Sequence, residues 1–191
     1  MKRSLIALAL AAVLPLSAQA GELSYNYVQL DYNRASVDDL DADPDGFGLK
    51  ASAALGDKFY LFGSYMKLSD TIEGFDVDLD QSQVGFGYHH AINDKADLLA
   101  ELSYINAKVD IEDVGSGSGD GYRASFGVRG QMAENFEGYA KANWTDAKDA
   151  DGEVSGTLGA LFKINATWGI NAEAEFGDGA TIWGLGVRAS F

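Results

Sequence analysis

A period of two in hydrophobicity recurs along most of the chain, and it limits the folds that the chain can adopt. Apolar side chains occupy every second position in residues 45–56, and residues 121–132 repeat the arrangement. Successive side chains of a β-strand point to opposite faces, so each such segment predicts a strand with one apolar and one polar face. The pattern indicates an all-β fold.

Ten segments of this kind are predicted, joined alternately by short turns and by longer polar loops. They cover residues 23–34, 45–56, 59–69, 80–91, 96–109, 121–132, 135–146, 153–164, 168–177 and 180–191. Each is long enough for the roughly nine to eleven residues of a tilted membrane strand, and this alternation of connections is typical of an up-and-down barrel. Eight strands are the alternative, because residues 23–34 and 59–69 alternate poorly.

The composition of the polar face indicates on which side the apolar face lies. A soluble barrel fills its interior with large side chains, whereas the polar face here is rich in glycine, serine and charged residues. We therefore expect the apolar face to contact lipid. The sequence predicts a single antiparallel, up-and-down transmembrane β-barrel.

The first twenty residues have the features of a signal peptide. Lys2 and Arg3 precede the apolar stretch 5–14, which is too short to span a bilayer, and Ala18 and Ala20 stand at the −3 and −1 positions of a cleavage site. The predicted domains are a signal peptide at 1–20 and a barrel at 21–191. This arrangement predicts export through the inner membrane to the outer membrane of a Gram-negative bacterium.

The charge of the chain excludes one class of partner. Residues 1–20 carry two of the 14 basic residues and none of the 29 acidic ones, so the remaining chain has a net charge of −17. Such a surface repels nucleic acids. There is no cysteine, so closure of the barrel has to hold the domain together without disulfides.

Charged residues of both signs are predicted on the face that lines the lumen. They are Lys50, Glu101, Arg123, Arg129, Glu137, Lys141, Glu173, Glu175 and Arg188. An unpaired buried charge costs several kcal/mol, so these groups have to pair. Arg129 and Glu137 become diagonal neighbours if residues 133–135 form a turn. The set is compatible either with a salt-bridged plug or with a small gated pore.

The longer loops are strongly acidic, and one of them begins like a calcium-binding loop. Asp41, Asp43 and Asp45 with Gly46 match the opening D-x-D-x-D-G, but Ser52 stands where the closing glutamate belongs. Within the four loops only Lys148 offsets the carboxylates. We expect a solvated, repulsive surface with no cofactor. The alternative is weak calcium binding at Asp41, Asp43 and Asp45, with divalent cations bridging to lipopolysaccharide phosphates.

The segment 180–191 alternates through Trp183, Leu185 and Val187 to Phe191. We interpret this as the signal that the barrel-assembly machinery recognises. Aromatic side chains near both ends of the strands predict two interfacial girdles against membrane lipid.

The two histidines do not suggest an active site. His89 and His90 are adjacent in a predicted strand, so they point to opposite faces, and no serine is marked as their partner. We expect no enzymatic activity.

Several motifs resemble those of one bacterial family. They are the first 32 residues, which end in GELSYNYVQLDY, then LFGSY at 61–65, QVGFGYHH at 83–90 and the final Phe191. The chain resembles the xanthomonad sulfation-dependent quorum-factor family of small outer-membrane β-barrel proteins. The resemblance implies an outer-membrane location and a link to quorum sensing or host recognition. We therefore expect a structural or surface-interaction barrel with an unidentified surface or host partner, and a small pore for ions or solutes is the alternative.

Overall fold

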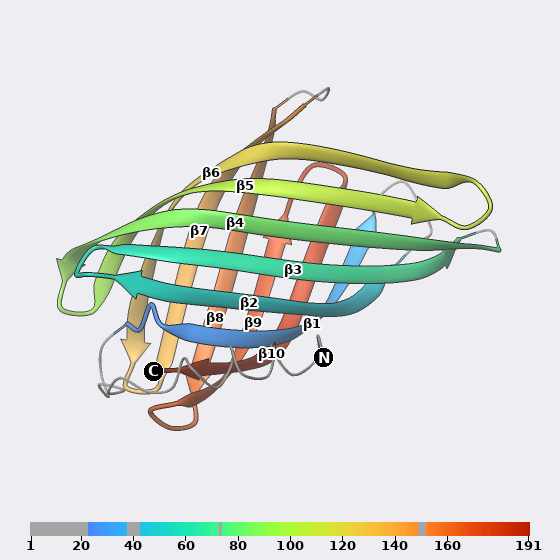
Figure 1. The fold of residues 1–191 in the computed structure, drawn as a ribbon. Coiled ribbons are helices and arrows are strands. Elements are labelled where there is room, and N and C mark those ends of the chain that lie inside the picture. The colour runs from blue at the N-terminus through green and yellow to red at the C-terminus, as the bar shows by residue number, and fades with distance from the viewer. Residues whose placement is uncertain (1–22, 38–42, 73, 149–151) are drawn as a thin grey trace, which may run out of the picture.

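Ten antiparallel strands form where hydrophobicity alternates. The computed structural model describes residues 23–37, 43–72, 74–148 and 152–191. The strands are β1 (Tyr27–Val37), β2 (Asp45–Leu55), β3 (Phe59–Ile72), β4 (Phe75–Asn93), β5 (Ala96–Ile111), β6 (Gly115–Ala133), β7 (Phe136–Ala147), β8 (Glu153–Lys163), β9 (Trp168–Phe176) and β10 (Ala180–Ser190). Each pairs with its neighbours in the chain (Figure 1).

Pairing of the first strand with the last closes the sheet into a barrel. The register of β1 against β10 runs from Tyr27 opposite Ser190 to Val37 opposite Ala180. The prediction of ten strands is confirmed, and the alternative of eight is wrong. The strand at 59–69 alternates poorly because both of its faces carry aromatic rings: Phe59 is exposed on the outer wall, whereas Tyr60 is buried in the lumen.

The two faces of the wall are distributed as in a membrane barrel. Leu102 on the outer face is 60% exposed, whereas Gln29 and Glu137 on the inner face are each 1% exposed. Large apolar side chains thus cover the outside and polar ones are buried, which is the reverse of a soluble domain. The predicted orientation of the faces is confirmed. No helix that could span a membrane occurs in the described ranges.

Two hairpins project far beyond the rest of the wall. β4 and β6 have 19 residues each, whereas β9 has nine. The segments 70–79 and 110–120, which we expected to be loops, are mostly strand, with turns only around Gly74 and Asp113. The projection is visible at the right of Figure 1, where β3–β6 extend past the other strands.

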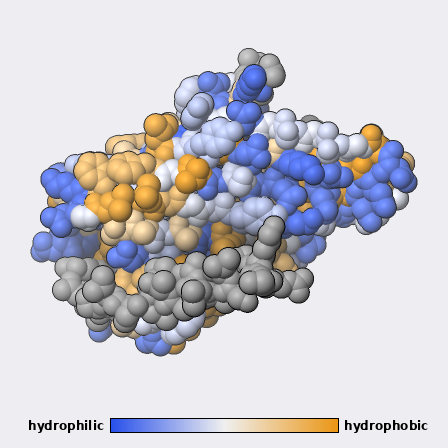
Figure 2. Space-filling model, viewed as in Figure 1, coloured by the Kyte–Doolittle hydropathy of each residue, from blue (hydrophilic) through white to orange (hydrophobic). Residues whose placement is uncertain are grey.

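In the projection the acidic residues occupy the outward strand positions, which are apolar nearer the membrane. From Asp76 to Asp80 apolar and acidic residues still alternate, but here the acidic residues share the face that is apolar nearer the membrane. A sheet surrounded by water has its polar side chains outward, so an outward row of carboxylates is compatible with a strand. Hydrophilic residues accordingly cover most of the projecting end in Figure 2.

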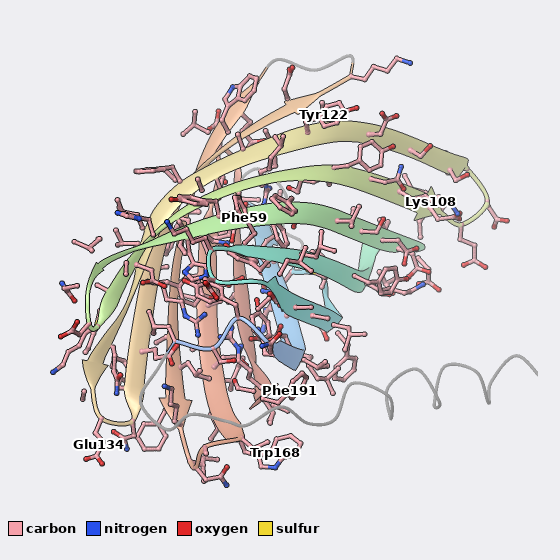
Figure 3. The ribbon with its side chains drawn as sticks, turned by 60° about the vertical axis from the view of Figure 1, so that its left-hand side comes forward. Phe59, Lys108, Tyr122, Glu134, Trp168 and Phe191 are labelled. Atoms are coloured by element: carbon pink, nitrogen blue, oxygen red, sulfur yellow. The ribbon has the colours of Figure 1, made fainter. Side chains whose placement is uncertain are left out.

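A row of exposed aromatic side chains marks where the outer face changes from apolar to polar. Tyr65, Tyr104, Tyr122, Trp144 and Trp183 all lie toward the long hairpins. At the other end Phe162 and Trp168 are exposed beside a short turn, and Figure 3 shows Trp168 and Glu134 there, away from Lys108 on the projection. The two rows agree with the predicted girdles and bracket the membrane-spanning part of the wall.

We predict that Leu102→Arg destabilises the barrel by about 2–4 kcal/mol, because it places a charge on the lipid-facing wall. Asn106→Arg lies on the same face of β5 beyond the aromatic row, and it should change stability by less than about 0.5 kcal/mol. Equilibrium unfolding in lipid vesicles measures both. Equal destabilisation by the two variants would contradict the placement of the membrane boundary.

Candidate functional site

The lumen brings most of the predicted inward charges together as pairs between non-neighbouring strands. Lys50 Nζ lies 2.6 Å from Glu173 Oε1, and Lys141 Nζ lies 3.1 Å from Glu101 Oε2. A third pair joins Arg123 to Glu175 at 3.0 Å. Lys141 and Glu101 stand two strands apart, and the partners of the other two pairs stand three strands apart. The ion pairs therefore bridge non-neighbouring strands across part of the lumen.

Two tyrosines complete these pairs. Tyr60 Oη donates a hydrogen bond to Glu101 at 2.7 Å, and Tyr139 Oη donates one to Glu173. Gly87 lies under the ring of Tyr60 and Gly159 under that of Tyr139, where a side chain would collide with the ring. Small residues on the inner wall thus make room for aromatic rings and long charged side chains.

Glu137 and Arg129, which are 1% and 6% exposed, form a triad with Lys163 toward the short turns. Glu137 is bound by Arg129 at 2.6 Å and by Lys163 at 2.5 Å. The proximity of Arg129 and Glu137 was predicted from the turn, whereas Lys163 was missed. It shares the inward parity of Thr157 on β8, and this parity could have identified it.

A short segment before β1 lies in the mouth of the barrel beside this triad. We call Leu23–Asn26 the mouth segment. Tyr25 within it stacks on His89 at 4.0 Å and on Tyr60 at 4.8 Å between ring centroids. Its hydroxyl donates to Asp97 at 2.7 Å, and Arg129 donates to the carbonyl of Ser24 at 2.8 Å.

This arrangement differs from the expected one in a single respect. Residues 23–26 were predicted to begin the first wall strand, but the strand starts at Tyr27 and Tyr25 lies inside the lumen. Tyr25 lies inside because its ring stacks on Tyr60 and His89 there and its hydroxyl donates to Asp97. His89 points inward and His90 is exposed, as the alternation predicted.

Further polar contacts fill the remaining lumen. Asp31 is 1% exposed and accepts hydrogen bonds from Gln29 and from Asn171, the latter at 2.6 Å. Arg188 donates to Gln29 at 2.7 Å and lies over the ring of Tyr27. Asp31 and Asp97 were not predicted as lumenal charges, although both have the inward parity.

Acids and bases balance within this network. The lumenal acids are Asp31, Asp97, Glu101, Glu137, Glu173 and Glu175, and the lumenal bases are Lys50, Arg123, Arg129, Lys141, Lys163 and Arg188. Such pairing reduces the cost of burying charge. The space left between them is a cavity of about 160 Å³, and a second cavity of about 860 Å³ opens at the mouth segment.

Acidic residues at the hairpin end form ion pairs with cations that lie on the flanking strands, outside the predicted loop boundaries. Arg34 Nη2 lies 2.7 Å from Asp43, and Lys67 lies 2.6 Å from Asp78. The expectation that Lys148 alone offsets these carboxylates is wrong, because cations on the flanking strands reach them. The hydrogen bond and the charge of Arg34 lower the pKa of the Asp43 carboxyl.

The predicted calcium ligands are partly described. Asp41 lies outside the described residues, Asp43 pairs with Arg34, and Asp45 accepts a hydrogen bond from Tyr32 at 2.8 Å. Within the described ranges, no group of three or more acidic, histidine or cysteine side chains could hold a metal ion. Calcium binding stays a prediction. The predicted signal peptide with Ala18 and Ala20 also lies outside the described residues.

The closing strand has the expected geometry. Trp183, Leu185 and Val187 are exposed on the outer wall. Phe191 follows β10, and its backbone N–H donates to the carbonyl of Asn26 at 3.0 Å. Recognition of this strand by the assembly machinery stays a prediction.

Comparison with known proteins identifies relatives of this fold. The family model described as the outer membrane protein beta-barrel domain matches residues 6–191. The solved structure of the NanC porin matches with a TM-score of 0.52 at 9% identity, covering 86% of this chain and 100% of that one. No match was found among the curated proteins.

Two further solved structures are similar at lower scores. The KdgM porin matches with a TM-score of 0.48 at 14% identity, and the match covers 85% of this chain and 99% of the porin chain. The Ail attachment invasion locus protein of Yersinia pestis has a TM-score of 0.44 at 18% identity, with coverages of 86% and 95%.

We predict that Glu137→Gln destabilises the barrel by about 3–5 kcal/mol, because it removes the carboxylate that neutralises the buried Arg129 and the neighbouring Lys163. Glu134→Gln in the adjacent exposed turn should have an effect below about 0.5 kcal/mol. Denaturant unfolding in vesicles compares the two. If Glu137→Gln unfolds like the unsubstituted protein, the triad does not contribute to stability.

Proposed function

The chain belongs to the outer membrane protein beta-barrel domain family, and on that basis we propose that it is a non-enzymatic surface barrel with a closed lumen. Its wall anchors it in the outer membrane, and its acidic hairpins present an interaction surface outside the cell. The short turns and the mouth segment face the periplasm, as is usual for such barrels.

The observation that carries this proposal is the set of ion pairs across the lumen. Lys50–Glu173, Lys141–Glu101 and Arg123–Glu175 bridge non-neighbouring strands, and the triad around Glu137 lies nearer the short turns. The cavity of about 160 Å³ between these pairs is small beside the roughly 300–1,000 Å³ of common ligand pockets, and the larger cavity of about 860 Å³ lies at the mouth segment. Because the lumenal side chains are paired with one another, we propose that the hairpins are the part of the protein that binds other molecules.

The hairpin surface favours positively charged partners. Asp76, Asp78 and Asp80 line the outer face of β4 above the aromatic row. Divalent cations would relieve the repulsion among such groups, and bridging to lipopolysaccharide phosphates is part of this proposal. The link to quorum sensing or host recognition, which the family resemblance implies, stays a prediction.

A small gated pore is the second candidate, and the polar lining of the lumen favours it. Lys50, Arg123 and Glu175 all border the central cavity. Long side chains that exchange partners could then admit ions or small solutes.

We predict that the protein gives no steady conductance in a planar lipid bilayer, because paired charges and the mouth segment obstruct the lumen. The double variant Arg129→Ala, Glu137→Ala removes a buried pair beside the mouth segment, and it should increase the frequency of openings. Heat-modifiable mobility on a gel verifies that each sample is folded. Steady ohmic steps from the unsubstituted protein would contradict the closed-lumen proposal and favour the pore.

A further inference from the structure

One strand of the projecting sheet has no neighbour along part of its length. β6 pairs with β5 from Gly115 onward, but its pairing with β7 begins only at Gly121. β7 ends at Ala147, and Thr145 pairs with Glu153 of β8. Among the described residues, no strand pairs with residues 115–119 on the side away from β5. In the described part of the chain, residues 115–119 form a sheet edge.

The backbone groups at this edge can be assigned to a side. The N–H of Lys148 donates to the carbonyl of Asp120 at 3.0 Å, so the backbone groups of Asp120 point away from β5. The N–H and C=O of a strand residue point to one side and alternate between successive residues. Ser116 and Ser118 therefore direct their N–H and C=O groups outward from the sheet.

The side chains of the edge leave it open to another strand. Ser116 and Ser118 are exposed, and a side chain at Gly117 or Gly119 would meet open space. Natural sheet edges are usually protected by lysine, proline, a bulge or a covering element. None of these occurs among residues 115–119.

The surroundings favour a basic partner. Asp110, Glu112, Asp113 and Asp120 lie beside the edge and outnumber the two cations there. Lys108 is paired with Asp110 at 2.9 Å, and Lys148 follows the end of β7 next to Asp120. On the opposite face Val109 stands directly across from Gly117 and is 38% exposed. A second copy of the chain would bring the same negative charge, so like charges oppose edge-to-edge pairing of two copies.

We propose that residues 115–119 of β6 bind an extended, basic segment of a partner protein, which adds as a strand to the sheet. Its basic residues lie opposite Ser116 and Ser118, on the acidic face. Its apolar residues lie opposite Gly117 and Gly119, where they contact Val109. This inference rests on the proposed surface-interaction function and names the partner's chemistry.

The test uses the folded protein in zwitterionic detergent micelles and a fluorescent peptide of four Lys-Val repeats, with binding measured by anisotropy. The peptide should bind saturably above its background on empty micelles. Ser118→Pro removes an outward N–H and blocks the edge while keeping the hydrogen bonds to β5, and it should weaken binding by about tenfold or more. Ser118→Ala keeps the backbone edge and should bind within about twofold of the unsubstituted protein.

Two modified peptides test the hydrogen bonds without any change in the protein. Methylation of the lysine backbone nitrogens removes the N–H groups that face Ser116 and Ser118, and it should abolish saturable binding. Methylation of the valine nitrogens alters only the far edge and should preserve it, at identical charge. A four-repeat Glu-Val peptide should not bind.

Equal binding by the protein and Ser118→Pro, or by both methylated peptides, would overturn the proposal and leave charge attraction alone. A dimer in sedimentation that Ser118→Pro dissociates would also overturn it, because a second copy would then occupy the edge. The bilayer experiment keeps the two proposals separate. A silent barrel that does not bind the peptide refutes only the docking edge, whereas a conducting barrel refutes the closed-lumen function.

Discussion

Every backbone N–H and C=O group inside a hydrocarbon layer needs a partner within the protein, and the pairing of β1 with β10 supplies the last of them. The other features follow from this closure. A closed wall has an inside that lipid cannot reach, so the outer side chains can be apolar while the inner ones have to satisfy one another. Strands leave the barrel only where water replaces lipid, and there β3–β6 continue as an open sheet.

The lumen shows how a small barrel manages the polar groups that it encloses. Its walls are lined by glycine wherever a ring or a long charged side chain crosses the interior, as at Gly87 under Tyr60. Each acid thereby reaches a base on another strand, and the interior is close to electrically neutral. Buried pairs of this kind are weak evidence for stability in comparison with an apolar core, but breaking one of them is strongly destabilising.

The alternation of side chains predicted the ten strands, the apolar outer face and the nine lumenal charges, because both properties depend only on residue parity. It also predicted the contact of Arg129 with Glu137, which are neighbours across a short turn. It could not predict Lys50 with Glu173, since 123 positions separate them and their meeting depends on the curvature of the whole wall. Tyr25 was predicted to lie in the first strand, because the alternation of side chains does not show where a strand begins. The projecting hairpins were predicted to be loops, because their outward residues are acidic.

The contacts of the mouth segment have a consequence for the order of folding. Ser24 donates to the carbonyl of Phe191, a residue 167 positions away, and Asn26 accepts from the same residue's N–H. The loop-closure entropy of such a contact has to be met before any of its stabilisation is gained. The eight strands between β1 and β10 can pair with their neighbours in the chain, so we expect the seam between β1 and β10 to form after them. On this view the contacts that close the wall and those that hold Tyr25 in the lumen form together.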